Sequence, residues 1–222
     1  MKAIPDHHLE TFIQTAHVAA SFGLVLLASG NLSMRIDEDR MLISASGACL
    51  STLDRERIVV CSIHNGEPLL EKGSGAGHIR PSIEVPLHTA ILRARPDMRL
   101  VLHFQSPYAT MAACRPDKEL NFHLIPEVPF FIGCIKTVDF HLPGSQELAE
   151  EIARAIGECN LVVMRNHGQV TGGRDADELL NRAVFFELAC RILASVPHPT
   201  SIPPQELIVM QRRGREARGS SV

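Results

Sequence analysis

The chain has 222 residues, 45% of them hydrophobic, which is enough to bury a large core and predicts one generous domain. Its formal net charge of −3 gives no electrostatic reason to expect a nucleic acid partner. Its apolar stretches are shorter than the roughly 20 residues of a membrane helix, and residues 1–10 lack a signal-peptide pattern, so we expect a cytoplasmic protein without a membrane partner.

The first part of the chain predicts a helix and then a β-hairpin. Apolar residues recur at helical spacing over about residues 6–22, and Gly23 ends this helix. Two short strand candidates follow at residues 32–36 and 41–44, separated by a charged segment. This arrangement is typical of a hairpin.

The middle of the chain predicts alternating strands and helices. The expected elements are a strand at residues 57–62, a helix at 81–94, a strand at 98–103 and a helix that begins at 106. Residues 73–77 (GSGAG) predict a flexible connector.

The last part of the chain predicts helices at residues 145–156 and 175–195, with a strand at 161–164 between them. Residues 1–200 are expected to form the domain. Residues 201–222 are expected to be a tail that is flexible or packs on a neighbouring subunit. Hairpins in the first half and interspersed helices favour a single-domain α/β/α sandwich with a largely antiparallel central sheet.

Two histidines lie where predicted strands end. His103 closes the strand at 98–103, and His167 lies in a glycine turn after the strand at 161–164. Zinc-type ions prefer nitrogen and oxygen ligands, and two strand-end histidines can converge on one ion. The alternative for each is a hydrogen-bonded histidine at a strand end, and the residues alone leave it open.

Glu84 is a carboxylate on a helix whose other residues predict burial. It is a candidate general acid or base with a raised pKa, or a metal ligand. The alternative is a solvated residue in the first helical turn, stabilised by the helix dipole. His88 lies four residues further on the same face, and we assign it to the structure.

Small polar residues and glycines form a third group of candidates. Gly30 with Asn31, Ser46 with Gly47, and Ser82 occupy predicted turns or a helix start. Backbone N–H groups and hydroxyls at such places bind phosphate or carboxylate. Each of these residues alone is also typical of an ordinary turn or cap.

Together these motifs resemble the class II aldolase/adducin family over roughly residues 8–196. Its GN-(I/L/V)-S-x-R, I-T-P-S-G, P-S-S-E-x-P-L-H, H-x-H and R-N-H-G motifs resemble residues 29–35 (SGNLSMR), 42–47 (LISASG), 81–88 (PSIEVPLH), 103–105 (HFQ) and 165–168 (RNHG).

The resemblance implies a divalent ion, most often Zn, bound by His103 and His167, with Glu84 as the catalytic acid and base. It also implies that the ion polarises a small hydroxy-carbonyl or sugar-phosphate-like substrate and stabilises an enediolate. Family members are typically homotetramers with active sites between subunits.

Three positions depart from the family pattern. Gln105 replaces the second histidine of H-x-H, so we expect it to be a weaker metal ligand and the ion to be Zn, Mn, Co or Mg. Ile83 replaces a hydroxyl of the implied phosphate site. The family draws a tyrosine from a neighbouring subunit, and His123 falls near that place and is a candidate substitute.

The leading hypothesis is therefore a metal-dependent carbon–carbon lyase that acts by retro-aldol cleavage or by decarboxylation. An epimerase or dehydratase is an alternative within the same superfamily, because one fold supports several reactions. A further alternative is an adducin-like binding or oligomerisation module without catalysis, which the replacements at Gln105 and Ile83 favour.

Overall fold

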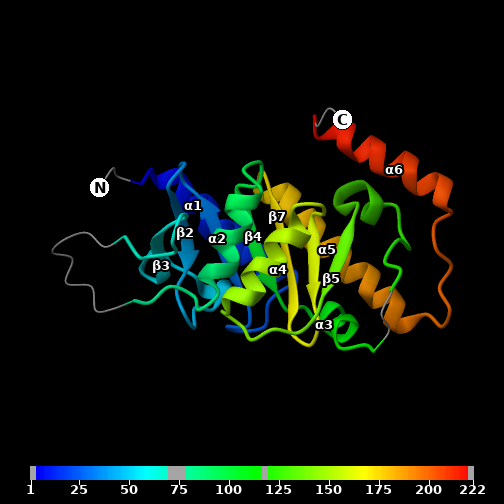
Figure 1. The fold of residues 1–222 in the computed structure, drawn as a ribbon, viewed down its shortest axis with the longest axis horizontal. Coiled ribbons are helices and arrows are strands. Elements are labelled where there is room, and N and C mark those ends of the chain that lie inside the picture. Colours follow the sequence, from blue (N-terminus) through cyan, green and yellow to red (C-terminus); the bar gives the residue numbers. More distant parts are fainter. Residues whose placement is uncertain (1–3, 70–78, 117–119, 220–222) are drawn as a thin grey trace.

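A seven-stranded β-sheet forms the centre of the computed structural model, which describes residues 4–69, 79–116 and 120–219 (Figure 1). Its strands are β1 Asn31–Arg35, β2 Arg40–Ser44, β3 Ile58–Ser62, β4 Leu100–Phe104, β5 Ile135–Val138, β6 Leu161–Met164 and β7 Gly168–Gly173. Their order across the sheet is β3-β2-β1-β4-β7-β6-β5. Neighbouring strands are antiparallel except β5 and β6, so the predicted largely antiparallel sheet is confirmed.

Helices cover both faces of the sheet, which confirms the predicted α/β/α sandwich. One face carries α1 (Asp6–Ser21), α3 (Pro107–Ala113) and α5 (Ala176–Ser195), and the other carries α2 (Val85–Ala94) and α4 (Gln146–Ile156) (Figure 1). The remaining elements are the short turns η1 Leu50–Thr52, η2 Arg55–Arg57 and η3 Val128–Ile132, and the helix α6 Pro204–Ala217. None of the described helices is long and apolar enough to cross a membrane.

Polar side chains set the beginnings of two helices that the sequence predicts. The hydroxyl of Ser145 accepts a hydrogen bond from the backbone N–H of Leu148 at 3.2 Å, at the start of α4. The carboxylate of Asp175 accepts one from Glu178 at 2.8 Å, at the start of α5. Such caps satisfy backbone donors that have no partner inside the helix, which explains why these helices begin where predicted.

The strands that carry the candidate site are buried along their whole length. Every residue of β2, β4, β6 and β7 is buried, as expected for strands covered by helices on both faces. Phe104 on β4 and Phe186 on α5 are fully buried. Helix α5 packs on β4 from one face of the sheet and α2 from the other, so the backbone around His103 is held on both faces.

Two strands, β5 and β7, were not predicted from the sequence. β7 has the sequence GQVTGG and is poor in the β-branched and aromatic residues that usually indicate a strand. Glycine is required there by packing, because a Cβ at Gly172 would lie 2.4 Å from the sulfur of Met98. The predicted hairpin and the strand at 57–62 are present as β1, β2 and β3.

Within the predicted tail at residues 201–222, the described residues 204–217 form helix α6. Helix α6 packs on η3, and a Cβ at Gly214 would lie 2.0 Å from the carbonyl oxygen of Phe130. Arg218 donates a hydrogen bond to the same carbonyl at 2.6 Å. The predicted packing of this segment on a neighbouring subunit stays a prediction, and the predicted connector at 73–77 lies outside the described residues.

Candidate metal centre

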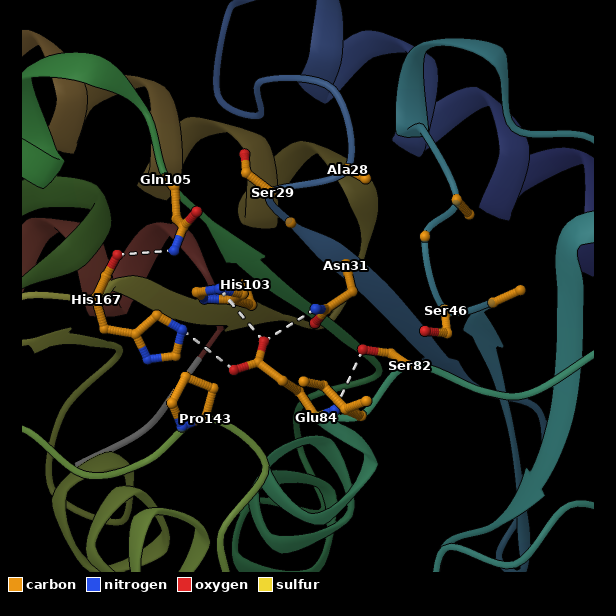
Figure 2. A pocket seen from close by; sticks show the side chains of 15 residues that line it. Ala28, Ser29, Asn31, Ser46, Ser82, Glu84, His103, Gln105, Pro143 and His167 are labelled. Atoms are coloured by element: carbon orange, nitrogen blue, oxygen red, sulfur yellow. Dashed lines mark hydrogen bonds and ion pairs between the residues drawn. The ribbon is translucent and has the colours of Figure 1, made fainter.

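Glu84, His103 and His167 come from separate elements and meet on the α2 side of the sheet (Figure 2). Glu84 directly precedes α2, His103 lies on β4, and His167 lies in the turn between β6 and β7. That turn places Asn166 at a φ of 54°, a conformation that asparagine tolerates better than most residues. Since β4 and β7 are neighbours, the two histidine rings lie with their centroids 4.8 Å apart.

The two distances from the Glu84 carboxylate to the histidines match the spacing of ligands on a single ion. Oε2 of Glu84 lies 3.3 Å from Nε2 of His103, and Oε1 lies 3.3 Å from Nε2 of His167. Ligand atoms that bind zinc tetrahedrally at about 2.0–2.1 Å are themselves about 3.3 Å apart. Glu84 and His103 are only 3% and 2% exposed, so the cluster is shielded from bulk water.

The hydrogen bond at Nδ1 of His103 shows that its other ring nitrogen, Nε2, carries a lone pair and faces the carboxylate of Glu84. Nδ1 of His103 lies 2.9 Å from the backbone carbonyl oxygen of Gln169, which can only accept, so Nδ1 donates. In the neutral ring Nε2 then carries a lone pair and faces a carboxylate oxygen. Two acceptors in contact require a proton or a cation between them, and a metal-bound histidine commonly donates its other nitrogen to a carbonyl in this way.

Two atoms of the cluster lack a hydrogen bond among the described residues, namely Oε1 of Glu84 and Nδ1 of His167. A buried polar atom without a partner costs about 1–3 kcal/mol. A cation placed between Oε1 of Glu84 and the two Nε2 atoms would remove the first of these costs. The donor set of one carboxylate and two imidazoles therefore fits a divalent ion of the zinc type.

The electrostatics of the cluster favour an ionised Glu84 carboxylate. Burial acts to raise the pKa of Glu84, but His103, His167 and the Asn31 amide outweigh it and hold the pKa well below its usual range. This is opposite to the raised pKa considered from the sequence, because the neighbouring side chains stabilise the charge. Burial lowers the pKa of His103, which favours its metal-binding form.

A pocket of about 230 Å³ opens beside the cluster. Its lining includes the cluster and all five predicted anion-binding residues, Gly30, Asn31, Ser46, Gly47 and Ser82 (Figure 2). No lysine or arginine lines the pocket in the part of the chain that the structure describes. Ile83 also lines it and is 66% exposed. The structure thus brings these candidates together, and anion binding by them stays a prediction.

Backbone geometry explains some of these residue types. A Cβ at Gly30 would lie 2.7 Å from the carbonyl oxygen of His103, so glycine permits the close approach of β1 to the cluster. Gly47 has a φ of +68°, a conformation that favours glycine. The hydroxyl of Ser82 accepts a hydrogen bond from the backbone N–H of Glu84 at 3.2 Å and fixes the turn before α2.

Gln105 lines the same pocket but makes a structural contact. Its Nε2 donates a hydrogen bond to the backbone carbonyl oxygen of His167 at 2.8 Å. Figure 2 shows the amide nitrogen on the side of His167 and the amide oxygen turned away from Glu84. In this rotamer Gln105 supports the His167 turn, and its predicted role as a ligand stays a prediction.

His123 lies outside the pocket lining. Its Nε2 lies 3.0 Å from the carbonyl oxygen of Gly133, and its backbone N–H donates to Asn121 at 2.9 Å. The residue is therefore fixed on a loop of this chain. A role in the site of a neighbouring subunit stays a prediction.

His88, for which the sequence predicts only a structural role, is linked to the cluster. His88 is fully buried, and its Nε2 lies 2.5 Å from Oδ1 of Asn31. The nitrogen of the same amide donates to Oε2 of Glu84 at 2.9 Å. The spacing of four residues between Glu84 and His88 was the signal that could have suggested the link, because it places both on one helix face.

Comparison with known proteins adds independent information. The family model described as Class II Aldolase and Adducin N-terminal domain matches residues 10–194. Among curated proteins, the chain is 27% identical over 169 residues to the 3-oxo-tetronate 4-phosphate decarboxylase of Haemophilus influenzae, with 75% of this chain and 77% of that protein covered. It is 30% identical over 180 residues to an L-fuculose phosphate aldolase of Methanococcus maripaludis, with 81% and 92% covered.

Solved structures share the fold. The structure of YgbL from Escherichia coli, a candidate aldolase, epimerase or decarboxylase, superposes with a TM-score of 0.82 at 22% identity. That match covers 92% of this chain and 98% of the other. An L-fuculose 1-phosphate aldolase superposes with a TM-score of 0.81 at 22% identity, covering 94% and 96%. At these identities the comparison supports the fold alone.

Proposed function

Because the chain belongs to the class II aldolase and adducin N-terminal domain family, we propose that it is a divalent-metal-dependent lyase. It breaks a carbon–carbon bond in a small hydroxy-carbonyl compound, by retro-aldol cleavage or by decarboxylation. One observation carries the proposal: a buried carboxylate, Glu84, lies 3.3 Å from the Nε2 atoms of both His103 and His167. A module that only binds a partner has no need of a buried carboxylate facing two imidazole nitrogens, with one carboxylate oxygen left without a hydrogen bond among the described residues.

The residues of the cluster have separate roles in this proposal. His103 and His167 hold the ion, and Glu84 takes a proton from the substrate and returns it. When bound, the ion supplies an electrophile that polarises a carbonyl oxygen and stabilises developing negative charge. Oε1 of Glu84 is the atom placed for proton transfer, because it is free of hydrogen bonds among the described residues.

Zinc is the proposed ion, because imidazole nitrogens such as those of His103 and His167 are preferred zinc ligands. Mn, Co and Mg remain candidates for a site in which position 105 carries an amide. Gln105 joins the ligands only if its side chain rotates away from the His167 carbonyl, which its present hydrogen bond opposes.

The names of the relatives suggest the class of substrate. The two curated relatives act on 3-oxo-tetronate 4-phosphate and L-fuculose phosphate. Ser46, Gly47 and Ser82 supply hydroxyl and turn groups suited to a phosphate or carboxylate. Ile83 places an apolar side chain at the pocket, so we propose a sugar-phosphate-like substrate or its unphosphorylated hydroxy-acid counterpart.

We also propose a cytoplasmic homotetramer with active sites between subunits, in which His123 acts as an acid in a neighbouring site. Large apolar side chains on the surface support an assembly: Phe22, Leu27 and Leu142 are 59%, 82% and 71% exposed. Exposed apolar surface of this kind is typical of protein contacts. Light scattering of the purified protein measures the assembly, and a monomer would contradict it.

The activity is tested with metal-stripped protein reloaded with Zn2+, Mn2+, Co2+ or Mg2+. Each form is incubated with L-fuculose 1-phosphate and with 3-oxo-tetronate 4-phosphate, and the released aldehyde and CO2 are measured. His167→Ala should lose the activity, whereas His64→Ala should keep it, because His64 is an exposed histidine paired with Asp39 away from the pocket. Equal activity with and without metal, or in His167→Ala, would contradict the proposal.

A binding module of the adducin type is the second candidate. The hydrogen bond from Gln105 to the His167 carbonyl favours it, because that bond uses the Gln105 amide for a structural contact instead of metal binding. It predicts a protein that takes up no metal and shows no turnover with either substrate. The same experiment therefore separates the two candidates.

A further inference from the structure

Four buried side chains form a continuous hydrogen-bonded row that ends on Glu84. Oγ of Ser33 lies 2.6 Å from Nδ1 of His88, and Nε2 of His88 lies 2.5 Å from Oδ1 of Asn31. Nδ2 of Asn31 lies 2.9 Å from Oε2 of Glu84. All four residues are at most 9% exposed, so water does not compete for these bonds.

Chemistry fixes the direction of every bond in this row. An ionised carboxylate only accepts, so the nitrogen of the Asn31 amide donates to Glu84 and its oxygen faces His88. That oxygen also only accepts, so Nε2 of His88 donates and its Nδ1 carries the lone pair. The hydroxyl of Ser33 then donates to Nδ1. Each donor therefore points toward the carboxylate, and the bonds polarise one another in the same sense.

The row forms because β1 and the start of α2 place side chains at nearly the same spacing. Asn31 and Ser33 are two residues apart on β1, so their side chains share one face and are separated by about 6.7 Å. Glu84 and His88 are four residues apart at the start of α2, which gives a rise of about 6 Å on one helix face. The strand and the helix thus present two pairs of side chains at nearly the same spacing.

From this geometry we propose that Ser33 and His88 are positioning residues, which act through Asn31 to fix the orientation of the Glu84 carboxylate. The inference rests on the proposed lyase function. The row anchors Oε2 of Glu84 and leaves Oε1, which has no hydrogen bond among the described residues, directed at His167. One oxygen is held while the other is free for proton transfer.

The proposal gives Asn31 a task besides the predicted anion binding. Its oxygen and one of its two amide hydrogens are already used, by His88 and Glu84. A single N–H is left for a substrate. If the Ser33 hydroxyl is removed, Nδ1 of His88 loses its hydrogen bond. The His88 ring then no longer holds the Asn31 amide in one orientation.

The test compares Ser33→Ala with two other variants. Ser33→Thr keeps the hydroxyl that donates to His88. Ser44→Ala is the matched control, because Ser44 is also buried and lies on the adjacent strand β2. Among the described residues, its side chain makes one hydrogen bond, which it accepts from the backbone N–H of Leu32 at 3.2 Å. Both alanine variants therefore lose one buried hydroxyl, but only one of them breaks the row.

The kinetic measurement uses Co2+-loaded protein in D2O and follows exchange of the carbon-bound protons of dihydroxyacetone phosphate and dihydroxyacetone by NMR. Ser33→Ala should exchange these protons about 10- to 100-fold more slowly than the wild type, as is typical when a residue that orients an active-site group is lost, with KM and bound Co2+ unchanged. Ser33→Thr should restore most of the rate. A Ser33→Ala rate equal to that of Ser44→Ala would overturn the proposal.

Crystal structures of the same proteins give a result that does not depend on activity. In Ser33→Ala the Asn31 amide should rotate and lose its contact with Glu84, whereas the other variants should keep it. An unchanged contact would overturn the proposal. If the wild type exchanges neither compound, the proposed function fails, and the structures still decide whether the row positions Glu84. If Ser33→Ala does not fold, Ser33→Cys, a weaker donor, carries the same expectations.

Discussion

Replacing His88 by glutamine should change how the stability of the protein depends on pH. Burial lowers the pKa of His88 from 6.5 to about 3, and Glu84 offsets this only in part. The folded state therefore binds a proton at His88 less readily than the unfolded state does. Stability from this residue is fully present above pH 6.5 and is lost as the pH falls from 6.5 toward 3.

The size of the effect follows from the shift. Each pH unit within this window costs about 1.4 kcal/mol per group, so between pH 7.5 and pH 5.0 His88 alone should remove about 2 kcal/mol from the free energy of unfolding. His103 also has a lowered pKa and contributes in the same sense. Only the difference between wild type and His88→Gln isolates His88.

The assay is urea unfolding of chelator-treated protein at pH 7.5, 6.5 and 5.0, followed by circular dichroism. From pH 7.5 to pH 5.0, the free energy of unfolding of the wild type should fall by about 2 kcal/mol more than that of His88→Gln. Equal losses would refute the assignment of His88 as a neutral, buried member of the row. Treatment with a chelator is needed because bound metal also couples stability to pH.

Three further variants test the geometry of the site. Gly168→Ala places a Cβ 2.8 Å from the carbonyl oxygen of Phe104 and should lower the free energy of unfolding by about 1–3 kcal/mol, measured by urea unfolding, and weaken metal binding. Gln105→His should tighten zinc binding in a chelator competition if position 105 faces the ion; unaltered affinity would show that it does not. Glu84→Gln should slow turnover about 10²–10⁴-fold in a rate assay, and a smaller loss would argue against a proton-transfer role.

The sequence indicated which residues meet at the site, because strand ends and turns are local features. His103 and His167 follow apolar runs, and Glu84 follows a proline–serine helix start. These patterns indicate that the side chains lie at strand ends and at a helix start, and they can be recognised before the full fold is known. The resemblance to a family then linked the three positions.

The orientation of polar groups could not be predicted in the same way. The contact of Gln105 with the His167 carbonyl and the direction of the Asn31 amide depend on rotamers that only the packed structure fixes. The sequence suggests a raised pKa for Glu84 as one alternative, because it indicates burial but does not show the neighbouring side chains that stabilise the ionised carboxylate. Strand β7 was missed because its glycines serve close packing against Met98, which is distant in sequence.

The central claim is that His103 and His167 hold one divalent ion beside Glu84, and elemental mass spectrometry tests it most directly. The protein is purified without a histidine tag or chelator, as wild type, His103→Ala and the surface control His64→Ala. About one ion per chain in wild type and His64→Ala, and loss of that ion in His103→Ala, is the predicted result. No ion in the wild type, even after incubation with Zn2+, Mn2+ or Co2+, would contradict the account.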